Sequence, residues 1–253
     1  MKMSTLDRAA KIQEYVRKAY LERHPSKLVK LCKEVSDILE AETSVEEVPQ
    51  TVGGPLYSAI YDALSPLRNE RLITQDFPEW LTAERFRAIQ LECSSLAERN
   101  EAESRYGPVY REVDSAAASL LRDPSFTAWV ENRIGCVSDQ SIAACYVTYH
   151  RPGQRCSIHI DNPSTHGYNC LIGLDSARRS PHPGSMLRIF GRSTFHDVEL
   201  APGRVVLFQA ACTPHSRTPL DEGEFIHILS IGFPLNRPAV ESAAASRLPG
   251  QTE

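Results

Sequence analysis

A histidine and a carboxylate that could bind one metal ion stand two residues apart in the stretch RCSIHIDNP, residues 155–163. Side chains alternate across a β-strand, so His159 and Asp161 would lie on the same face of a strand. A second histidine, His215, follows in the stretch TPHSRTP. Two histidines and one carboxylate, with coordination positions left open, are the ligand set of non-haem Fe(II) oxygenases. The pattern predicts a metal site made of these three residues.

The same pair is also compatible with a hydrogen-bonded polar cluster inside a β-sandwich that binds no metal. The flanking sequence favours the metal site. Tyr149 and a Pro152-Gly153 turn precede His159, and an apolar run that starts at a glycine, residues 203–208, precedes His215. Both histidines are therefore expected beside short strands.

The second half of the chain has the pattern of consecutive β-strands. From about residue 141 the sequence breaks into short segments rich in β-branched and aromatic residues, each bounded by Gly, Pro, Asn or Asp. Such a series without intervening helices predicts a sandwich or barrel. The predicted strands are 141–149, 156–160, 168–174, 186–190, 195–200, 204–209 and 225–233.

The first part of the chain is helical in pattern. Apolar residues recur at helical spacing, and Asp123-Pro124 is typical of a helix cap followed by a first-turn proline. We expect the apolar stripes to pack on the outer face of the larger sheet, although a dimer surface is an alternative use. The predicted helical segments are 5–22, 25–42, a short helix within 51–66, 82–103, 113–123 and 124–134.

These patterns divide the chain into three parts. Residues 1–140 form a mostly helical region, residues 141–234 a β core, and residues 235–253 a small, polar, loose tail. The fold class is α+β.

Composition narrows the class of protein. The 253 residues carry a formal net charge of −4, which argues against a general nucleic-acid binder. Seven scattered cysteines without a C-x-x-C pair fit neither a structural zinc site nor a disulfide framework, and they favour a reducing compartment. With neither a secretory signal nor a long apolar run visible, the expected location is cytoplasmic, with no membrane and no nucleic-acid partner.

Five motifs occur in one order over residues 141–234: Y-x-x-P-G, H-I-D-N-P, G-S-M-L-R-I-F, F-x-D-V-E-L-x-P-G-R-V-V-L-F and P-H-S-R-T-P. With them the sequence resembles the Fe(II)/2-oxoglutarate-dependent dioxygenases. It is most similar to their prolyl-hydroxylase branch, which includes the hypoxia-inducible-factor prolyl hydroxylases. The first 140 residues carry no motif that takes part in this resemblance.

The resemblance implies a double-stranded β-helix, a cupin-like jelly roll, as the core. It implies that His159, Asp161 and His215 bind Fe(II), and that Tyr149 lies at the co-substrate pocket as a catalytic-site residue. The implied co-substrates are 2-oxoglutarate and O₂, with ascorbate as a further candidate cofactor. The implied reaction hydroxylates a C–H bond of an amino acid, a peptidyl (prolyl-type) side chain or a small metabolite, and releases succinate and CO₂.

The sequence departs from the family where the far carboxylate of 2-oxoglutarate is bound. The family places an Arg or Lys on the last core strand, but the matching residue is Phe225, or Glu224 with a one-residue shift. Some members add a tyrosine from the strand after H-x-D, where this chain has Gly173 or a neighbour. A buried carboxylate needs a charged or hydrogen-bonding partner, so another residue has to supply it.

Three replacements are visible. Arg217 is two residues after His215, so in a regular strand it would share the face of that ligand, and its planar fork suits a carboxylate of 2-oxoglutarate or of a small substrate. His227 is the second candidate, on the face of Phe225. Arg188 is the third, but it points outward if its neighbours face the core. Two other functions stay open: an Fe(II) oxygenase that does not use 2-oxoglutarate, and a non-enzymatic metal-binding β-helix module.

Overall fold

The computed structural model describes residues 14, 30, 33–37, 55–65, 68, 72–98, 107–135, 142–177 and 184–235. The helices predicted at 5–22 and 25–42 fall largely outside these residues, and so does the predicted tail after residue 235.

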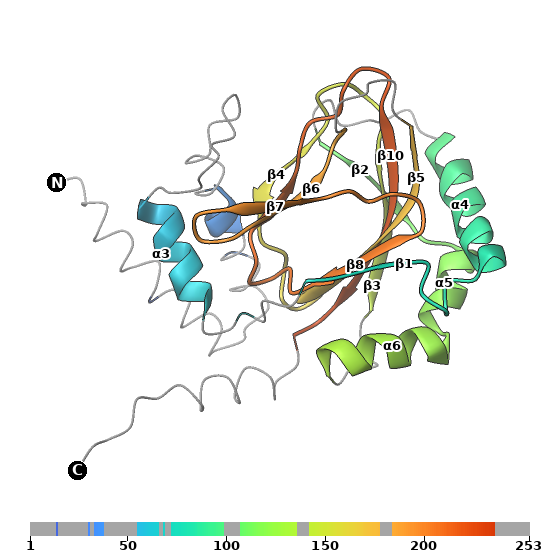
Figure 1. Cartoon of the computed structure of the whole chain (residues 1–253), viewed down its shortest axis with the longest axis horizontal. Coiled ribbons are helices and arrows are strands. Elements are labelled where there is room, and N and C mark those ends of the chain that lie inside the picture. The colour runs from blue at the N-terminus through green and yellow to red at the C-terminus, as the bar shows by residue number, and fades with distance from the viewer. Residues whose placement is uncertain are drawn as a thin grey trace, which may run out of the picture.

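Two antiparallel sheets face each other and form the body of the molecule (Figure 1). The larger sheet has the strand order β1 (Ile73–Asp76), β8 (Arg204–Phe208), β5 (Tyr168–Ala177), β10 (Phe225–Phe233), β3 (Ala143–Tyr149) and β2 (Val109–Glu112). The smaller sheet has the order β4 (Cys156–His159), β9 (His215–Arg217), β6 (Leu187–Phe190) and β7 (Phe195–Val198).

Alternation along each strand separates the two sides of the larger sheet. On β10, Ile226 and Ile228 join the apolar core between the sheets, whereas Leu229 and Ile231 join the core on the opposite side. The seven predicted strands each overlap an observed one. Three short strands were not predicted: β1 and β2, which precede residue 141 and flank the larger sheet, and β9, which carries His215.

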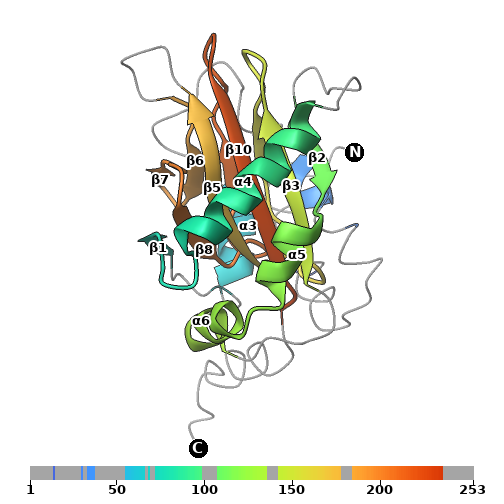
Figure 2. The same ribbon diagram turned by 90° about the vertical axis from the view of Figure 1, so that its right-hand side faces the viewer.

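Helices cover the outer side of the larger sheet. Figure 2 shows α4 crossing this sheet, with α5 and α6 below it. The helices are α4 (Ala83–Glu98), α5 (Ser115–Leu121) and α6 (Pro124–Ile134). Phe86 and Ile89 of α4 and Phe126 of α6 share one apolar core with Leu229 of β10. The predicted cap of α6 is confirmed, because the Asp123 carboxylate accepts hydrogen bonds from the first-turn backbone amides.

Helix α3 (Pro55–Leu64) packs against the smaller sheet. The helix buries Ile60 and Leu64 against Ile158 and Phe190. The Tyr57 hydroxyl donates a 2.6 Å hydrogen bond to the Gly191 carbonyl, which ties the helix to the end of β6. No helix in the described part of the chain is long and apolar enough to cross a bilayer.

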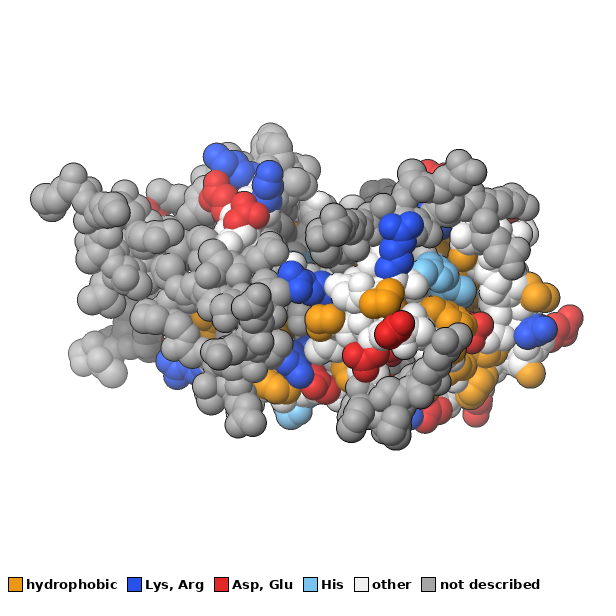
Figure 3. All heavy atoms as spheres, turned by 90° about the horizontal axis from the view of Figure 1, so that it is seen from above, with side chains coloured by type: hydrophobic (Ala, Val, Ile, Leu, Met, Phe, Trp, Pro, Cys, Tyr) orange, Lys and Arg blue, Asp and Glu red, His pale blue; other side chains and the backbone are white. Residues whose placement is uncertain are grey.

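The face of the molecule drawn in Figure 3 carries both acidic and basic side chains. On the face in Figure 3, basic and acidic side chains are interspersed over the described residues. Nucleic-acid binders usually present basic residues clustered on one face, and this face lacks that pattern in its described part.

Gly173 explains why no tyrosine can occupy that position of β5. A β-carbon on Gly173 would lie 2.3 Å from the Ala201 carbonyl oxygen and 2.5 Å from that of Leu200. Both contacts are with backbone atoms, which cannot rotate away as a side chain can. The close approach of the 200–201 turn therefore requires glycine.

Replacing Gly173 with alanine is expected to destabilise the fold by about 1–3 kcal/mol, because the added methyl group overpacks a rigid contact. Urea unfolding of Gly173→Ala measures the loss. Ser176→Ala, on the same strand, is the matched control and should unfold near the wild-type midpoint. Equal midpoints for Gly173→Ala and wild type would contradict the contact.

Candidate metal centre and co-substrate pocket

A cavity of about 310 Å³ lies between the two sheets. Half of its sixteen lining side chains are apolar or aromatic and half are polar. Polar groups that converge in a partly apolar pocket are typical of small-molecule sites. The lining residues are Tyr110, Cys145, Val147, Tyr149, Cys156, His159, Asp161, His166, Asn169, Leu171, Leu187, His215, Ser216, Arg217, Ile228 and Ser230.

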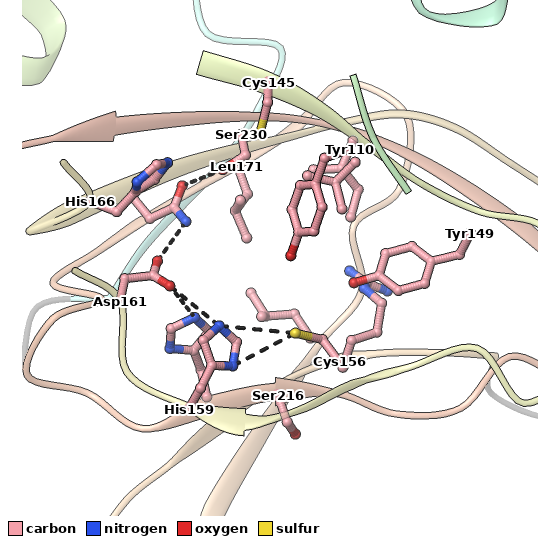
Figure 4. Close-up of a pocket in the computed structure, with 16 residues that line it drawn as sticks. Tyr110, Cys145, Tyr149, Cys156, His159, Asp161, His166, Leu171, Ser216 and Ser230 are labelled. Atoms are coloured by element: carbon pink, nitrogen blue, oxygen red, sulfur yellow. Dashed lines mark hydrogen bonds and ion pairs between the residues drawn. The ribbon is translucent and has the colours of Figure 1, made fainter. Parts of the chain in front are cut away.

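The three predicted metal ligands meet at one side of this cavity. One ligand atom from each of His159, Asp161 and His215 lies within 4.8 Å of the others. Asp161 Oδ1 is 3.3 Å from His159 Nε2 and 3.7 Å from His215 Nε2. The pairing of β4 with β9 sets His159 opposite His215, and Asp161 follows just after β4. Figure 4 shows Asp161 and His159 directed toward each other at the cavity edge.

Both imidazoles are oriented by backbone carbonyls. His159 Nδ1 lies 2.8 Å from the Ser157 oxygen, and His215 Nδ1 lies 3.0 Å from the Thr213 oxygen. A carbonyl can only accept, so each Nδ1 carries a proton and each Nε2 is the nitrogen that faces the cavity. Metal-binding histidines have this arrangement. The donor set therefore fits a divalent cation held by two Nε2 atoms and one carboxylate oxygen.

Charge at the site matches this role. Burial acts to raise the pKa of Asp161, but the neighbouring His215 and His159 outweigh it and hold the pKa well below its usual range. Burial, together with the charge of His159, lowers the pKa of His215 to about 4. At neutral pH the site thus offers an ionised carboxylate and, at His215, a neutral imidazole. At His159 burial acts to lower the pKa, but Cys156 and Asp161 outweigh it and raise the pKa well above its usual value, so a metal ion has to displace a proton from this imidazole.

Arg217 lies in the wall of the same cavity as His215. The residue is only 4 % exposed, and burial lowers the pKa of its guanidinium, although arginine stays charged in proteins. Its Nη1 donates to the Ser185 carbonyl oxygen at 3.2 Å. Its Nη2 is buried and has no hydrogen-bond partner within the described residues. Tyr149 and the Glu224 carboxylate lie near the guanidinium and oppose the effect of burial on its pKa. The free donor can still pair with an anion in the cavity.

Glu224 holds the surroundings of Arg217 in place. Its carboxylate accepts hydrogen bonds from the backbone amides of Ser185 at 2.7 Å and Asp221 at 2.9 Å. Ser185 in turn accepts from Arg217. Glu224 is the residue that a one-residue shift would align with the Arg or Lys of the family. In this structure it is an acid that anchors the loop before β6.

Phe225 and His227 do not line the cavity. The inward positions of this strand are Ile226, Ile228 and Ser230, so Phe225 and His227 fall on the other face. His227 instead packs against His150, with ring centroids 4.9 Å apart, and against Phe225, at 5.2 Å. The spacing of residues along β10 relates Phe225 to His227 but does not indicate which face of the strand points inward.

Arg188 also lies outside the cavity, as alternation predicts. Its guanidinium forms two 2.7 Å hydrogen bonds with the Asp197 carboxylate and stacks over the Phe195 ring. Leu187 and Ile189 on either side are buried in the inner core. Of the three replacement cations, Arg217 alone lines the cavity.

Two tyrosines approach the cavity from the larger sheet. Tyr149, at the end of β3, is buried, and burial raises the pKa of its hydroxyl well above its ordinary value, so the hydroxyl stays protonated. The Arg217 guanidinium lies 5.5 Å from the centre of its ring. Tyr110 of β2 was not predicted: the residue is 58 % exposed, yet Figure 4 shows its hydroxyl directed into the cavity. No motif marks Tyr110, since β2 precedes the stretch that resembles the family.

The buried His227 should make the protein sensitive to acid. Its two ring nitrogens are buried and have no hydrogen-bond partner among the residues that the structure describes, and the residue is 6 % exposed. Burial, with the charge of His150, lowers the pKa of His227 from 6.5 to about 4, against the opposing effect of Asp175. Because the folded state binds this proton less well than the unfolded state, stability is full above pH 6.5 and falls as the pH drops toward 4.

The expected loss is about 2 kcal/mol between pH 7 and pH 5. His227→Phe keeps an aromatic ring against His150 and Phe225 and removes the titrating group, so its stability should fall less over this range. Urea unfolding of both proteins at the two pH values measures the difference. Parallel losses in wild type and variant would assign the acid sensitivity to other groups.

Comparison with known proteins relies on structure. No protein-family model matches the sequence, and no curated protein matches it. The structure of a prolyl-4-hydroxylase from Pseudomonas putida is similar over 72 % of this chain and 100 % of that chain, with 21 % sequence identity and a TM-score of 0.53.

Two further structures have the same fold. A 2-oxoglutarate–Fe(II) oxygenase from Burkholderia pseudomallei matches 72 % of this chain and 91 % of its own, with 16 % identity and a TM-score of 0.52. A prolyl hydroxylase from Trichoplax adhaerens, in complex with a hypoxia-inducible-factor peptide fragment, matches 76 % of this chain and 94 % of its own, with 14 % identity and a TM-score of 0.50. The chain therefore has the jelly-roll fold of the prolyl-hydroxylase-like 2-oxoglutarate–Fe(II) oxygenases.

Proposed function

We propose that the protein is an Fe(II)- and 2-oxoglutarate-dependent dioxygenase. It hydroxylates a C–H bond in an amino acid, a peptidyl (prolyl-type) residue or a small metabolite and releases succinate and CO₂. The observation that carries the proposal is one cavity lined by both His159–Asp161–His215 and the buried, incompletely paired Arg217. The iron, when bound, supplies O₂ activation, with ascorbate as a candidate reductant that keeps it ferrous.

The chain's own residues have separate tasks in this proposal. His159, Asp161 and His215 hold the metal from one side and leave the other positions for 2-oxoglutarate and O₂. Arg217 pairs with the far carboxylate of 2-oxoglutarate through its free Nη2, and the protonated Tyr149 hydroxyl is a second donor near it. His227 is set aside for this task, because it lies outside the cavity wall.

The apolar walls serve the same chemistry. Val147, Leu171, Leu187 and Ile228 line the cavity and limit the water in it. Removal of water strengthens the pairing of Arg217 with a carboxylate, because the charges then interact in a medium of low dielectric constant. The catalytic unit is the β core of residues 141–234, completed by β1 and β2, and we expect it to work in the cytoplasm.

The peptidyl substrate class has support from one similar structure, since the Trichoplax adhaerens prolyl hydroxylase holds a peptide fragment.

The proposal is tested by anaerobic loading with Fe(II) and 2-oxoglutarate, followed by O₂ and measurement of succinate. Succinate release above the metal-free control supports the enzyme. Absence of both 2-oxoglutarate binding and turnover would favour the metal-binding module. Turnover of a substrate without 2-oxoglutarate would favour the other class of Fe(II) oxygenase.

A further inference from the structure

We propose that Asn169 and Ser230 are positioning residues that hold Asp161 as a one-oxygen ligand and thereby set the affinity of the metal site. The inference rests on the proposed function in one respect: that His159, Asp161 and His215 bind a divalent metal. It adds two residues that the sequence motifs do not mark.

The two residues form a short hydrogen-bonded chain that ends at Asp161. Asn169 Nδ2 donates to Asp161 Oδ2 at 3.0 Å, and Ser230 Oγ donates to Asn169 Oδ1 at 3.0 Å. Both residues are buried, with 7 % and 5 % exposure. In Figure 4 one carboxylate oxygen of Asp161 is directed toward these hydrogen-bonded side chains and the other toward the imidazoles.

The chemistry of the groups determines the direction of each bond. A carboxylate oxygen accepts the hydrogen bond, so the amide nitrogen of Asn169 must face Asp161. The amide oxygen then faces Ser230, which must donate its hydroxyl proton. A flipped amide would lose the bond to Asp161 and set two oxygens against each other. Ser230 therefore locks Asn169 in the orientation that Asp161 needs.

The fold brings the three residues together from different places. Asp161 follows β4 in the smaller sheet, whereas Asn169 lies on β5 and Ser230 on β10 in the larger sheet. Asn169 is opposite Gly232 on β10, and Ser230 is the next inward position along that strand. The two hydrogen bonds thus connect the Asp161 carboxylate to the centre of the larger sheet.

Asp161 differs in this respect from the two histidines. Backbone carbonyls orient His159 and His215, and no substitution removes a backbone carbonyl. A side chain, Asn169, orients Asp161. With Oδ2 engaged, Oδ1 remains for the metal and a second coordination position is kept free. Without Asn169 the carboxylate could rotate and bind through both oxygens or turn away from the metal.

The test is titration of the apoprotein with Co(II), without 2-oxoglutarate or substrate. Asn169→Ala is expected to weaken Co(II) binding about 10–100-fold, the usual effect of removing a hydrogen-bond partner of a ligand. Ser230→Ala should weaken it less but measurably. Ser230→Thr, which keeps the hydroxyl, should restore it. The visible absorption spectrum of bound Co(II) should change in the first two variants, which a loss of stability alone would not cause.

The matched control is Ser176→Ala on β5, which removes a serine hydroxyl from a residue that does not line the cavity. It should bind Co(II) like wild type. If wild type binds no Co(II), the proposed function fails. If wild type binds and both Asn169→Ala and Ser230→Ala match it in affinity and spectrum, the proposed function stands and the positioning role is overturned. If Asn169→Ala does not fold, the comparison of Ser230→Ala with Ser230→Thr decides the matter.

Discussion

Replacing His215 with alanine is expected to abolish Fe(II) binding and with it all turnover. His215 is buried, its ring packs edge-on against Phe208 at 4.9 Å, and its Nε2 faces Asp161. The variant leaves two ligands where three are needed to hold the metal from one side. The loss of affinity should exceed the roughly 10–100-fold that follows removal of a ligand's hydrogen-bond partner.

Calorimetric titration of the apoprotein with Fe(II) under anaerobic conditions measures this effect. His196→Ala is the matched control, because His196 lies exposed on β7, outside the cavity wall. It should bind Fe(II) with wild-type affinity. Unchanged binding in His215→Ala would mean that the His-Asp-His cluster is an ordinary polar cluster of the sheet.

Arg217→Ala is expected to weaken 2-oxoglutarate binding by at least about thirtyfold while metal binding stays intact. The physical reason is the loss of a buried, charge-assisted partner for the far carboxylate, an effect of roughly 2–5 kcal/mol. Arg217→Lys should fall between wild type and Arg217→Ala, because it keeps the charge but not the two-pronged geometry. Binding of 2-oxoglutarate to the Fe(II)-loaded protein, followed anaerobically, gives the three affinities.

Arg188→Ala is the control for Arg217, since the Arg188 guanidinium pairs with Asp197 away from the cavity. It should leave 2-oxoglutarate affinity unchanged. Unchanged 2-oxoglutarate affinity in Arg217→Ala, together with weakened substrate binding, would contradict the role proposed for Arg217. Arg217 would then bind a carboxylate of the substrate, and a different residue would anchor 2-oxoglutarate.

Strands with strong local patterns could be predicted from the sequence. The segments around Val147, Ile172 and Leu229 alternate or run apolar between clear turn residues, and each became a central strand. The unpredicted strands β1, β2 and β9 have three or four residues each, and β1 and β2 lie among segments with a helical pattern. Their pairing depends on partners far away in sequence, such as Ile73 with Leu207.

Some residues of the site could also be predicted from the sequence, and others could not. The spacing of His159, Asp161 and His215 with their flanking motifs was enough to predict a cluster that the structure brings within 4.8 Å. Period two along β9 was enough to place Arg217 beside His215. The same rule could not place His227, because it relates neighbours on one strand and does not say which face is inward. Tyr110, Asn169 and Ser230 depend on contacts between strands, which no local pattern encodes.

Anaerobic addition of Fe(II) and then 2-oxoglutarate to the apoprotein, followed by absorption spectroscopy, shows whether the cavity binds both groups together. Bidentate binding of the 2-oxo acid to iron gives a metal-to-ligand charge-transfer band. We expect this band in wild type and no band in Asp161→Ala. In Arg217→Ala the band should require higher 2-oxoglutarate concentrations. A wild-type protein that binds Fe(II) but shows no band at any 2-oxoglutarate concentration would contradict the proposed function.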